Sequence, residues 1–261
     1  MRPVPVLMYH HINPHRGDTV TVTPEVFESQ LRYLRESGYR TLTAEELFSF
    51  MKGELKLRHK AVVITFDDGW LDNYLYALPV LKKYRLNATM FIITNRVEMA
   101  SGNVVSLPAG VPTHNESKAL LEKGDAYKVA LSWELIEEMA AGGLVGFYSH
   151  TKSHRKCDRL SEQQLREELG ESKETIEKRL GRTCPFLCWP YGKYNDSAVR
   201  LAGEAGYQAL FTTDHGVVTA GSDPSAIKRI VVKDKSEWFR SRMFVYTNPV
   251  LSPLYLAVRK K

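Results

Sequence analysis

The sequence has few cysteines and no long hydrophobic run. Its 3 cysteines, Cys157, Cys184 and Cys188, are an odd number without zinc-ribbon spacing, which argues against a disulfide framework. No stretch approaches the roughly 18 consecutive apolar residues of a membrane-spanning helix, so we expect no transmembrane segment. The start, MRPVPVLMYHHI, lacks the apolar core of a secretion signal. We therefore expect a cytoplasmic protein, or a periplasmic or secreted one if the sequence is trimmed from a longer chain.

Charge of one sign is not concentrated along the chain. Lysine and arginine number 36 against 30 acidic residues, which leaves a formal net charge of +6. The basic residues alternate with acidic ones, as in ELKLRHK and EELGESKETIEKR. Such a pattern is typical of solvated helix faces rather than of a nucleic-acid surface, so we expect no nucleic-acid partner. Low-complexity tracts are absent, and 43% hydrophobic residues indicate an ordinary globular protein.

Apolar runs of strand-like composition recur, each followed by a segment with helical periodicity. The expected strands are residues 3–9, 61–66, 88–94, 144–149, 185–191, 209–213 and 227–232. The expected helices are residues 24–37, 43–51, 73–84, 132–143, 161–180 and 196–205. This alternation predicts an α/β fold with a parallel sheet, and about seven strands suggest closure into a barrel. Residues 95–130, rich in glycine and proline, are expected to form a long loop that borders the site.

Two adjacent carboxylates follow the second expected strand, in Asp67-Asp68-Gly69. In parallel α/β folds, functional side chains gather where strands end. Two neighbouring carboxylates repel each other unless a cation or a shared proton relieves them. For a DDG sequence on its own, a helix cap or a turn is the commoner explanation.

Two histidines, His150 and His154, follow the strand at residues 144–149. Histidines four residues apart can grip one metal ion through neutral imidazoles, although this spacing alone is a weak signal. Combined with an aspartate from another strand end, they form a plausible ligand set that leaves positions open for water and substrate. A third turn, Pro190-Tyr191-Gly192, could aim a backbone N–H at a developing oxyanion.

The three stretches TFDDG, SHTKSH and WPYGKYN, in this order, resemble the NodB-homology polysaccharide deacetylases, carbohydrate esterase family 4. The resemblance implies a distorted (β/α)7 barrel and a metal-dependent hydrolase that removes acetyl groups from an N-acetylated glycan. It covers most of the chain. We expect one barrel domain over residues 1–235, with residues 236–261 as a C-terminal extension packed on the barrel or trailing from it.

The resemblance also implies roles for single residues. Asp67 matches the general base, and Asp68, His150 and His154 match the ligands of one divalent ion, usually Zn²⁺. Tyr191 matches the residue whose backbone N–H joins the oxyanion hole and borders the substrate.

The family's usual acid, in a Leu-x-His motif near the C-terminus, is missing, because no histidine follows His215. The chain resembles a circularly permuted subset, the poly-β-1,6-N-acetylglucosamine deacetylases, in which the strand with this histidine comes first. His10, in Leu7-Met8-Tyr9-His10, then becomes the candidate acid, and His11 is expected to point away from the site. The remaining histidines are expected to be loop or surface residues: His15, His59, His114 and His215.

Three positions carry open questions. Cys188 stands where the family often has an arginine that orients the base, so the pKa of Asp67 is expected to depend more on the metal and on Asp68. Tyr148 places a bulky aromatic ring close to the ligands, which could narrow the substrate groove. Trp70 is a candidate for stacking on a sugar and equally for a place in the core.

Three functions remain open at this point. The first is removal of N-acetyl groups from a glycan. The second is hydrolysis of O-acetyl esters or small amides on the same scaffold. The third is a sugar-binding barrel without catalysis, which the adjacent carboxylates beside an open metal site argue against. The sequence identifies neither the polymer nor the oligomeric state.

Overall fold

The computed structural model describes residues 2–102 and 110–259. Seven parallel strands close into a barrel, because β11 pairs with β1 and β1 pairs with β5. In order around the barrel the strands are β1 (Val4–Tyr9), β5 (Ala61–Phe66), β6 (Ala88–Ile92), β7 (Val145–Ser149), β8 (Phe186–Cys188), β9 (Ala209–His215) and β11 (Ile227–Val231). The seven-stranded barrel predicted from the alternation of strands and helices is confirmed.

The strands β1 and β5 close the barrel with four residue pairs in register, and β6 and β7 share five. Every residue in both strands is buried, as expected for parallel strands covered on both faces. The pairing is weakest between β7 and β8, which share the single pair Ser149 and Leu187. The barrel is therefore distorted on that side.

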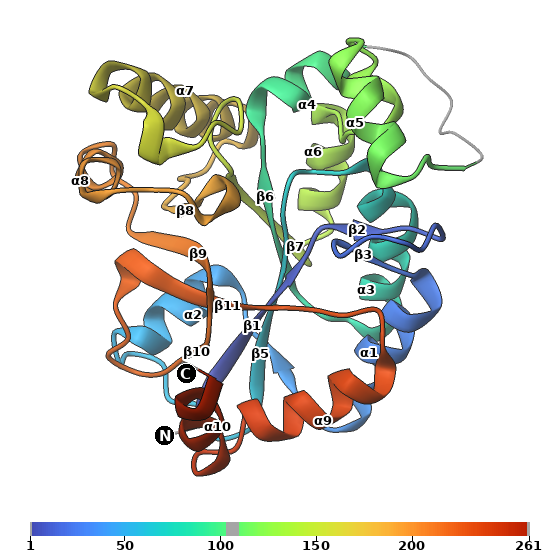
Figure 1. Cartoon of the computed structure of the whole chain (residues 1–261), viewed down its shortest axis with the longest axis vertical. Coiled ribbons are helices and arrows are strands. Elements are labelled where there is room, and N and C mark those ends of the chain that lie inside the picture. Colours follow the sequence, from blue (N-terminus) through green and yellow to red (C-terminus); the bar gives the residue numbers. More distant parts are fainter. Residues whose placement is uncertain (1, 103–109, 260–261) are drawn as a thin grey trace.

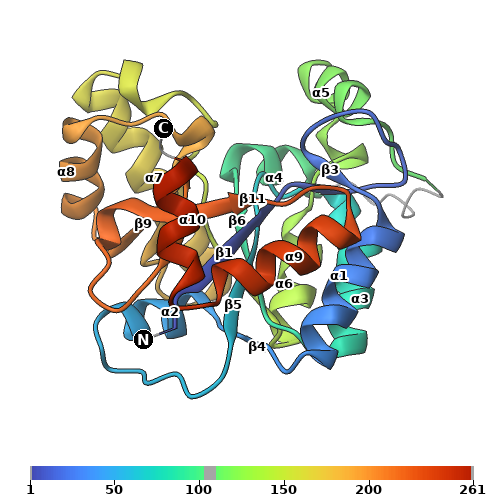
Figure 2. The ribbon, with the colours of Figure 1, turned by 60° about the horizontal axis from the view of Figure 1, so that its bottom comes forward.

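Helices surround the barrel, with α1, α3 and α6 on one side and α7 and α8 on the other (Figures 1 and 2). Their bounds are α1 (Pro24–Glu36), α2 (Ala44–Met51), α3 (Leu78–Tyr84, after a π-helix at Asn73–Ala77), α6 (Trp133–Ala141), α7 (Glu162–Leu180) and α8 (Asp196–Glu204). Thr43 and Ser161 close capping boxes at the starts of α2 and α7. Each satisfies backbone N–H groups that the first helical turn leaves free.

The segment 95–130 is largely helical where the structure describes it, so the prediction of a long loop is wrong there. It contains α4 (Thr94–Ala100), α5 (His114–Glu122) and a 3₁₀ turn (Ala126–Lys128), while residues 103–109 lie outside the described residues. Thr113 and Glu116 form a capping box at the start of α5. This motif is visible in the sequence and could have revealed the helix.

Four short strands extend the sheet or flank the site. β2 (His11–Ile12) pairs with β3 (Thr21–Val22), β4 (Arg40–Thr41) lies beside β5, and β10 (Val217–Val218) runs antiparallel to β1. The pairing of β2 with β3 fixes the chain directly after the end of β1, where the candidate acid His10 stands.

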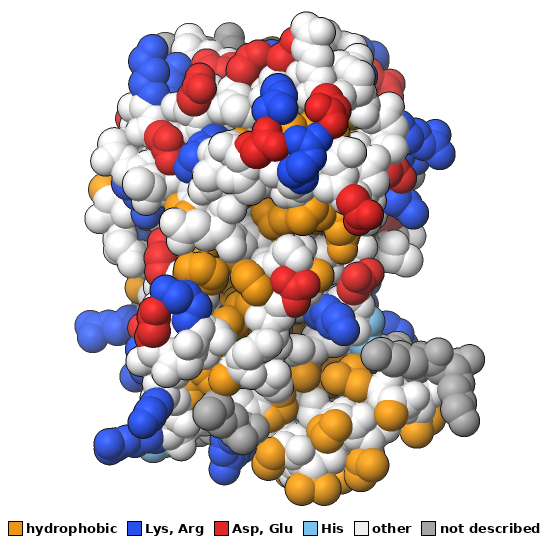
Figure 3. Space-filling model, turned by 90° about the vertical axis from the view of Figure 1, so that its left-hand side faces the viewer, with side chains coloured by type: hydrophobic (Ala, Val, Ile, Leu, Met, Phe, Trp, Pro, Cys, Tyr) orange, Lys and Arg blue, Asp and Glu red, His pale blue; other side chains and the backbone are white. Residues whose placement is uncertain are grey.

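The last two helices, α9 (Ser236–Tyr246) and α10 (Leu251–Arg259), pack outside the barrel near the start of β1 (Figure 2). The Phe239 ring meets Tyr33 of α1 edge to face. A boundary at residue 235 stays a prediction. Side chains of this region form an apolar patch at the lower end of the molecule in Figure 3: Phe244, Val250, Leu251, Leu254 and Val258. Within residues 2–102 and 110–259, every helix is too short or too polar to cross a bilayer.

Candidate active site

A pocket of about 220 Å³ opens at the carboxyl ends of the barrel strands. Six of the residues chosen from the sequence line it, together with Trp70 and residues of α5: His10, Asp67, Asp68, His150, His154 and Tyr191. They come from the ends of β1, β5, β7 and β8. The fold therefore brings these distant residues to one place, as the strand-end argument predicted.

Asp68 and the two histidines form a tight cluster. Oδ1 of Asp68 lies 3.2 Å from Nε2 of His154 and 3.7 Å from Nε2 of His150. Nδ1 of His150 lies 2.7 Å from the Cys188 carbonyl oxygen, which can only accept, so Nδ1 carries the proton and neutral Nε2 is bare. Asp68 Oδ1 is buried and has no hydrogen-bond partner among the described residues. Acceptor atoms facing one another in this way call for a cation.

The charge states of these groups also suit a metal. Burial lowers the pKa of His150, and it lowers that of His154 to about 3, so both imidazoles are neutral near pH 7. Burial alone would raise the pKa of Asp68, but His154 and Arg96 beside it bring that pKa below its usual value. One carboxylate and two neutral imidazoles within 4.8 Å of one another are a donor set that fits a zinc-type divalent ion.

Unusual backbone conformations concentrate at this pocket. Of the five non-glycine residues with positive φ in the described chain, four belong to the site: Asp68 (75°), Thr151 (65°), His154 (61°) and Tyr191 (57°). Such conformations are uncommon and often mark functional sites. The Tyr191 turn also requires Gly192, because a Cβ there would lie 2.0 Å from Oγ1 of Thr213 on β9.

Asp67, the candidate base, is held by a buried arginine that sequence reasoning missed. Nη1 and Nη2 of Arg229 on β11 each donate to one carboxylate oxygen of Asp67 at 2.7 Å. Nε of Arg229 donates to the carbonyl of Thr212 at 2.8 Å, which fixes the plane of the guanidinium. Burial would raise the pKa of Asp67, but Arg229 lowers it below its usual value. Asp67 is therefore ionised and rigidly oriented.

This pair corrects the expectation drawn from Cys188. The cation absent at that position is supplied from another strand, and Nη2 of Arg229 lies 3.0 Å from the Cys188 sulfur. Arg229 is therefore the main charged side chain that lowers the pKa of Asp67. The sequence held one signal, since Arg229 interrupts the apolar strand IKRIVV at a fully buried position.

Replacing Arg229 with methionine should destabilise the protein by about 3–5 kcal/mol, because it leaves the Asp67 carboxylate buried without its partner. The lowered folded-state pKa of Asp67 adds stability that is present above its unfolded pKa of about 3.9 and lost as pH falls. The difference in the free energy of unfolding between the wild type and this variant, measured with urea, should therefore become smaller at acidic pH. Without the guanidinium, the pKa of Asp67 should rise and move the acid limb of kcat/KM to higher pH. Arg58→Met, at an exposed arginine, is the control.

His10 lies at the same edge of the barrel as the metal cluster. Its Nε2 is 3.9 Å from Oδ2 of Asp67, and its side chain is 24% exposed. Asn73 donates to the His10 carbonyl at 3.0 Å and fixes the backbone there. The structure thus places His10 in the pocket; its role as the acid stays a prediction.

Trp70 does not offer a face for stacking on a sugar. One face is stacked on the His11 ring, with centroids 4.2 Å apart, and the Arg96 guanidinium lies 4.6 Å from the ring centroid. The indole N–H donates to Oδ2 of Asp68 at 3.0 Å. Trp70 is 2% exposed, so it orients the candidate ligand Asp68 rather than presenting an open platform.

Tyr191 lies at the rim of the pocket, whereas Tyr148 is buried away from it. Tyr191 is 56% exposed at the rim of the pocket, and its ring lies 4.5 Å from that of His154, so contact with substrate stays a prediction. Its backbone has a φ of 57° in the turn Pro190–Gly192. Tyr148 is absent from the pocket lining; its ring packs on Phe186 and its hydroxyl donates to Glu45 of α2. The expectation that Tyr148 narrows the groove is therefore wrong.

Two histidines assigned no role in the sequence analysis lie at or behind the pocket wall. His11 is 1% exposed, stacks on Trp70 and lies 2.5 Å from Oδ2 of Asp72. His114 on α5 lines the pocket and lies 3.0 Å from His11, so its assignment to the surface is wrong. The sequence alone does not show that His11 and His114, which are 103 positions apart, are in contact.

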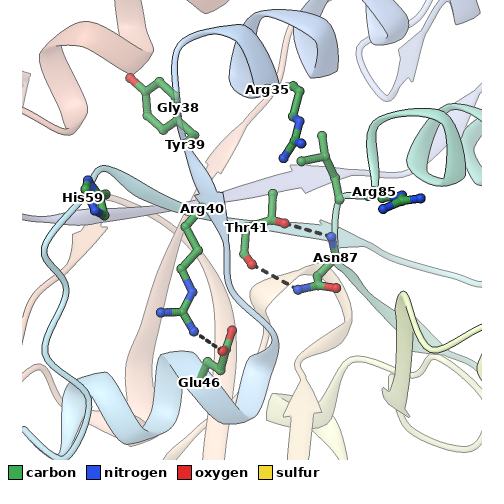
Figure 4. A pocket seen from close by; sticks show the side chains of 10 residues that line it. Arg35, Gly38, Tyr39, Arg40, Thr41, Glu46, His59, Arg85 and Asn87 are labelled. Carbon is green, nitrogen blue, oxygen red and sulfur yellow. Dashed lines mark hydrogen bonds and ion pairs between the residues drawn. The ribbon is translucent and has the colours of Figure 1, made fainter.

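A second hollow of about 470 Å³ lies beside β4, away from these residues. Arg35, Arg40 and Arg85 surround it, with Arg40 paired to Glu46 (Figure 4). Its lining contains a single carboxylate and a single imidazole, Glu46 and His59. It therefore lacks the paired acids and the ligand set of the first pocket.

Comparisons with known proteins agree with this geometry. The family model described as polysaccharide deacetylase matches residues 54–210. The poly-beta-1,6-N-acetyl-D-glucosamine N-deacetylase of Staphylococcus aureus (strain N315) is 30% identical over 217 residues, 82% of this chain and 68% of that protein. YxkH of Bacillus subtilis (strain 168) is 31% identical over 229 residues, 88% of this chain and 71% of that protein.

A solved structure shows the same likeness in three dimensions. Deacetylase PplD of Streptococcus pyogenes, in complex with acetate, superimposes with a TM-score of 0.77 at 26% identity, covering 95% of this chain and 99% of that one. The motifs TFDDG and SHTKSH and the turn at Tyr191 lie within residues 54–210, which the family model matches. The chain belongs to the polysaccharide deacetylase family.

Proposed function

We propose that this protein is a metal-dependent N-deacetylase that hydrolyses the acetamido group of an N-acetylated glycan. One observation carries the proposal. A single pocket contains three things: a cluster of ligand atoms that fits a divalent ion, an oriented carboxylate and an imidazole. Asp68, His150 and His154 would hold the ion. Asp67 and His10 lie beside that cluster and beside each other.

Each side chain has a definite task in this proposal. A bound divalent ion would polarise the acetyl carbonyl and acidify water. The Asp67 carboxylate accepts a proton from the attacking water, and Arg229 keeps it ionised and oriented. The backbone N–H of Tyr191 stabilises the oxyanion, and His10 gives a proton to the departing sugar amine. Burial of the pocket strengthens these electrostatic effects.

The substrate class is supported by the relatives. The name of the Staphylococcus aureus protein specifies a polymer of N-acetyl-D-glucosamine and removal of an N-linked acetyl group. A primary amine is a poor leaving group unless it is protonated as it departs, so amide hydrolysis requires an acid such as His10. We therefore place an N-acetylated amino sugar in the pocket.

The test is acetate release from N-acetylglucosamine oligomers and from poly-N-acetylglucosamine by the metal-loaded protein. Acetate release is expected, with about one divalent ion per chain, and chelation should abolish it until Zn²⁺ is restored. Release from O-acetylated sugars alone would indicate an esterase instead. Sugar binding without acetate release from any substrate would indicate a catalytically inactive barrel. Activity that is insensitive to complete metal removal would contradict the role of the cluster.

A further inference from the structure

A chain of polar side chains runs behind Trp70 and ends at the pocket. Nδ1 of His11 lies 2.5 Å from Oδ2 of Asp72, and Nε2 of His11 lies 3.0 Å from Nδ1 of His114. Asp72 and His11 are 3% and 1% exposed in their side chains. The catalytic roles proposed above use none of these three groups. Each polar group in a buried network needs a hydrogen-bond partner, so the orientation of these three side chains is well defined.

The network begins at Asp72. Its carboxylate accepts from Nδ1 of His11, and Nε2 of His11 forms a hydrogen bond with Nδ1 of His114. Nε2 of His114 takes no part in this network. Because His114 lines the pocket and its Nδ1 is occupied, Nε2 is the ring atom free to meet a ligand. The network thus leaves Nε2 of His114 as the hydrogen-bonding atom of this ring at the pocket wall.

The wall that carries His114 is held by the segment after β1. Asn13 donates to the carbonyl of Pro112 at 2.8 Å, and Nε2 of His15 donates to the carbonyl of Val111 at 2.9 Å. Together with His11, these alternate residues hold the start of α5 against the barrel. The His114 ring is therefore fixed in place before any ligand arrives, which limits the entropy lost on binding.

A donor stands one helical turn along the same wall. Lys118 also lines the pocket and follows His114 by four residues, the spacing that puts two side chains on one helix face. Hydrogen-bond donors and acceptors on such a wall match the hydroxyl, ring and amide groups of a sugar. The metal cluster, Asp67 and His10 already account for the acetyl group being cleaved.

We propose that His114 and Lys118 form a subsite for the sugar next to the one that is deacetylated, with His11 and Asp72 as positioning residues. The subsite rests on the proposed function. Nε2 of His114 forms a hydrogen bond with a hydroxyl or acetamido group of that neighbouring sugar. The Lys118 ammonium donates to one of its oxygens. Oligomers should therefore be preferred over single sugars and small acetyl compounds.

The experiment compares two substrates, an N-acetylglucosamine tetramer and a small aryl acetate that has no neighbouring sugar. In His114→Ala and Lys118→Ala, KM for the tetramer should rise roughly 3- to 10-fold with little change in kcat, the range expected for one lost hydrogen bond. Hydrolysis of the aryl acetate should be unchanged. Lys123→Ala, at the exposed end of α5, is the matched control and should alter neither substrate.

A second set of variants tests the positioning role. His11→Ala should reproduce the rise in KM, and the double variant His11→Ala/His114→Ala should be no worse than either single variant if His11 acts through His114. Equal losses on both substrates, or an unchanged KM for the tetramer, would overturn the subsite. If the wild type releases no acetate, the proposed function fails. Calorimetric binding of the tetramer then decides the subsite, and equal Kd values for wild type and His114→Ala would reject it.

Discussion

Replacing His154 with alanine should remove both the metal and the activity of this protein. Only Asp68 and His150 would remain as ligands, and Oδ1 of Asp68 has no other hydrogen-bond partner among the described residues. Metal analysis should find well under the roughly one ion per chain that a three-ligand site holds. Acetate release should fall more than about 100-fold, beyond the usual effect of removing a group that only supports a ligand.

Backbone strain has to be separated from ligand loss in this test. His154 has a φ of 61°, which alanine adopts at a cost and glycine adopts freely. His154→Gly should therefore lose the metal equally while folding at least as well as the alanine variant. His59→Ala, at an exposed histidine beside the second hollow, should keep metal and activity. Full metal occupancy in both His154 variants would refute the ligand assignment.

The parts of the site that could be read from the sequence are those tied to strand ends. Asp67 and Asp68 directly follow β5, and His150 directly follows β7. In a parallel barrel all strands end at one edge, so a polar residue after an apolar strand is already placed there. His10 likewise directly follows β1, but it was the resemblance to the circularly permuted subset that made it a candidate. The barrel itself followed from the alternation of strands and helices.

The supporting residues could not be read in this way. Arg229 lies inside β11, where its partner depends on which strand face points inward and on a barrel closed by pairing between β1 and β11. Trp70 follows the DDG motif as a sugar-binding residue would, and only the positions of His11 and Arg96 show that its faces are covered. Long-range packing, rather than local periodicity, decides both cases.

The loop prediction for residues 95–130 was wrong for a different reason. Its glycines and prolines indicated a loop, yet a capping box at Thr113 starts the helix α5. The capping box at the start of α5 was thus a better guide to its structure than the glycine and proline content of the segment. The helix brings His114 to the pocket, where Asp72 and His11 hold it. His114 could not be distinguished from a surface histidine without the contact to His11.

If His10 is the acid, His10→Ala and His10→Asn should keep the metal and the fold yet lose activity by about 10²–10⁴, mainly in kcat. Nε2 of His10 faces Asp67 at 3.9 Å and is not one of the three clustered ligands, so its loss leaves Asp68, His150 and His154 in place. Protonation of the leaving amine is then lost while attack on the carbonyl remains possible. Metal content, circular dichroism and steady-state kinetics on an N-acetylglucosamine oligomer measure the three parts of this result.

The leaving group provides the sharper test of the same prediction. The leaving group of an aryl acetate is a stabilised phenolate, which needs no acid. A sugar amine, in contrast, cannot leave without a proton. His10→Ala should therefore spare the aryl ester while it disables the amide. His11, which supports His114 and contacts Trp70, is unsuitable as a silent control, so His59→Ala serves again. Equal losses on ester and amide would show that His10 acts on an earlier step, such as orientation of Asp67. An unchanged rate on the amide would remove His10 from the mechanism and require another proton donor in the pocket.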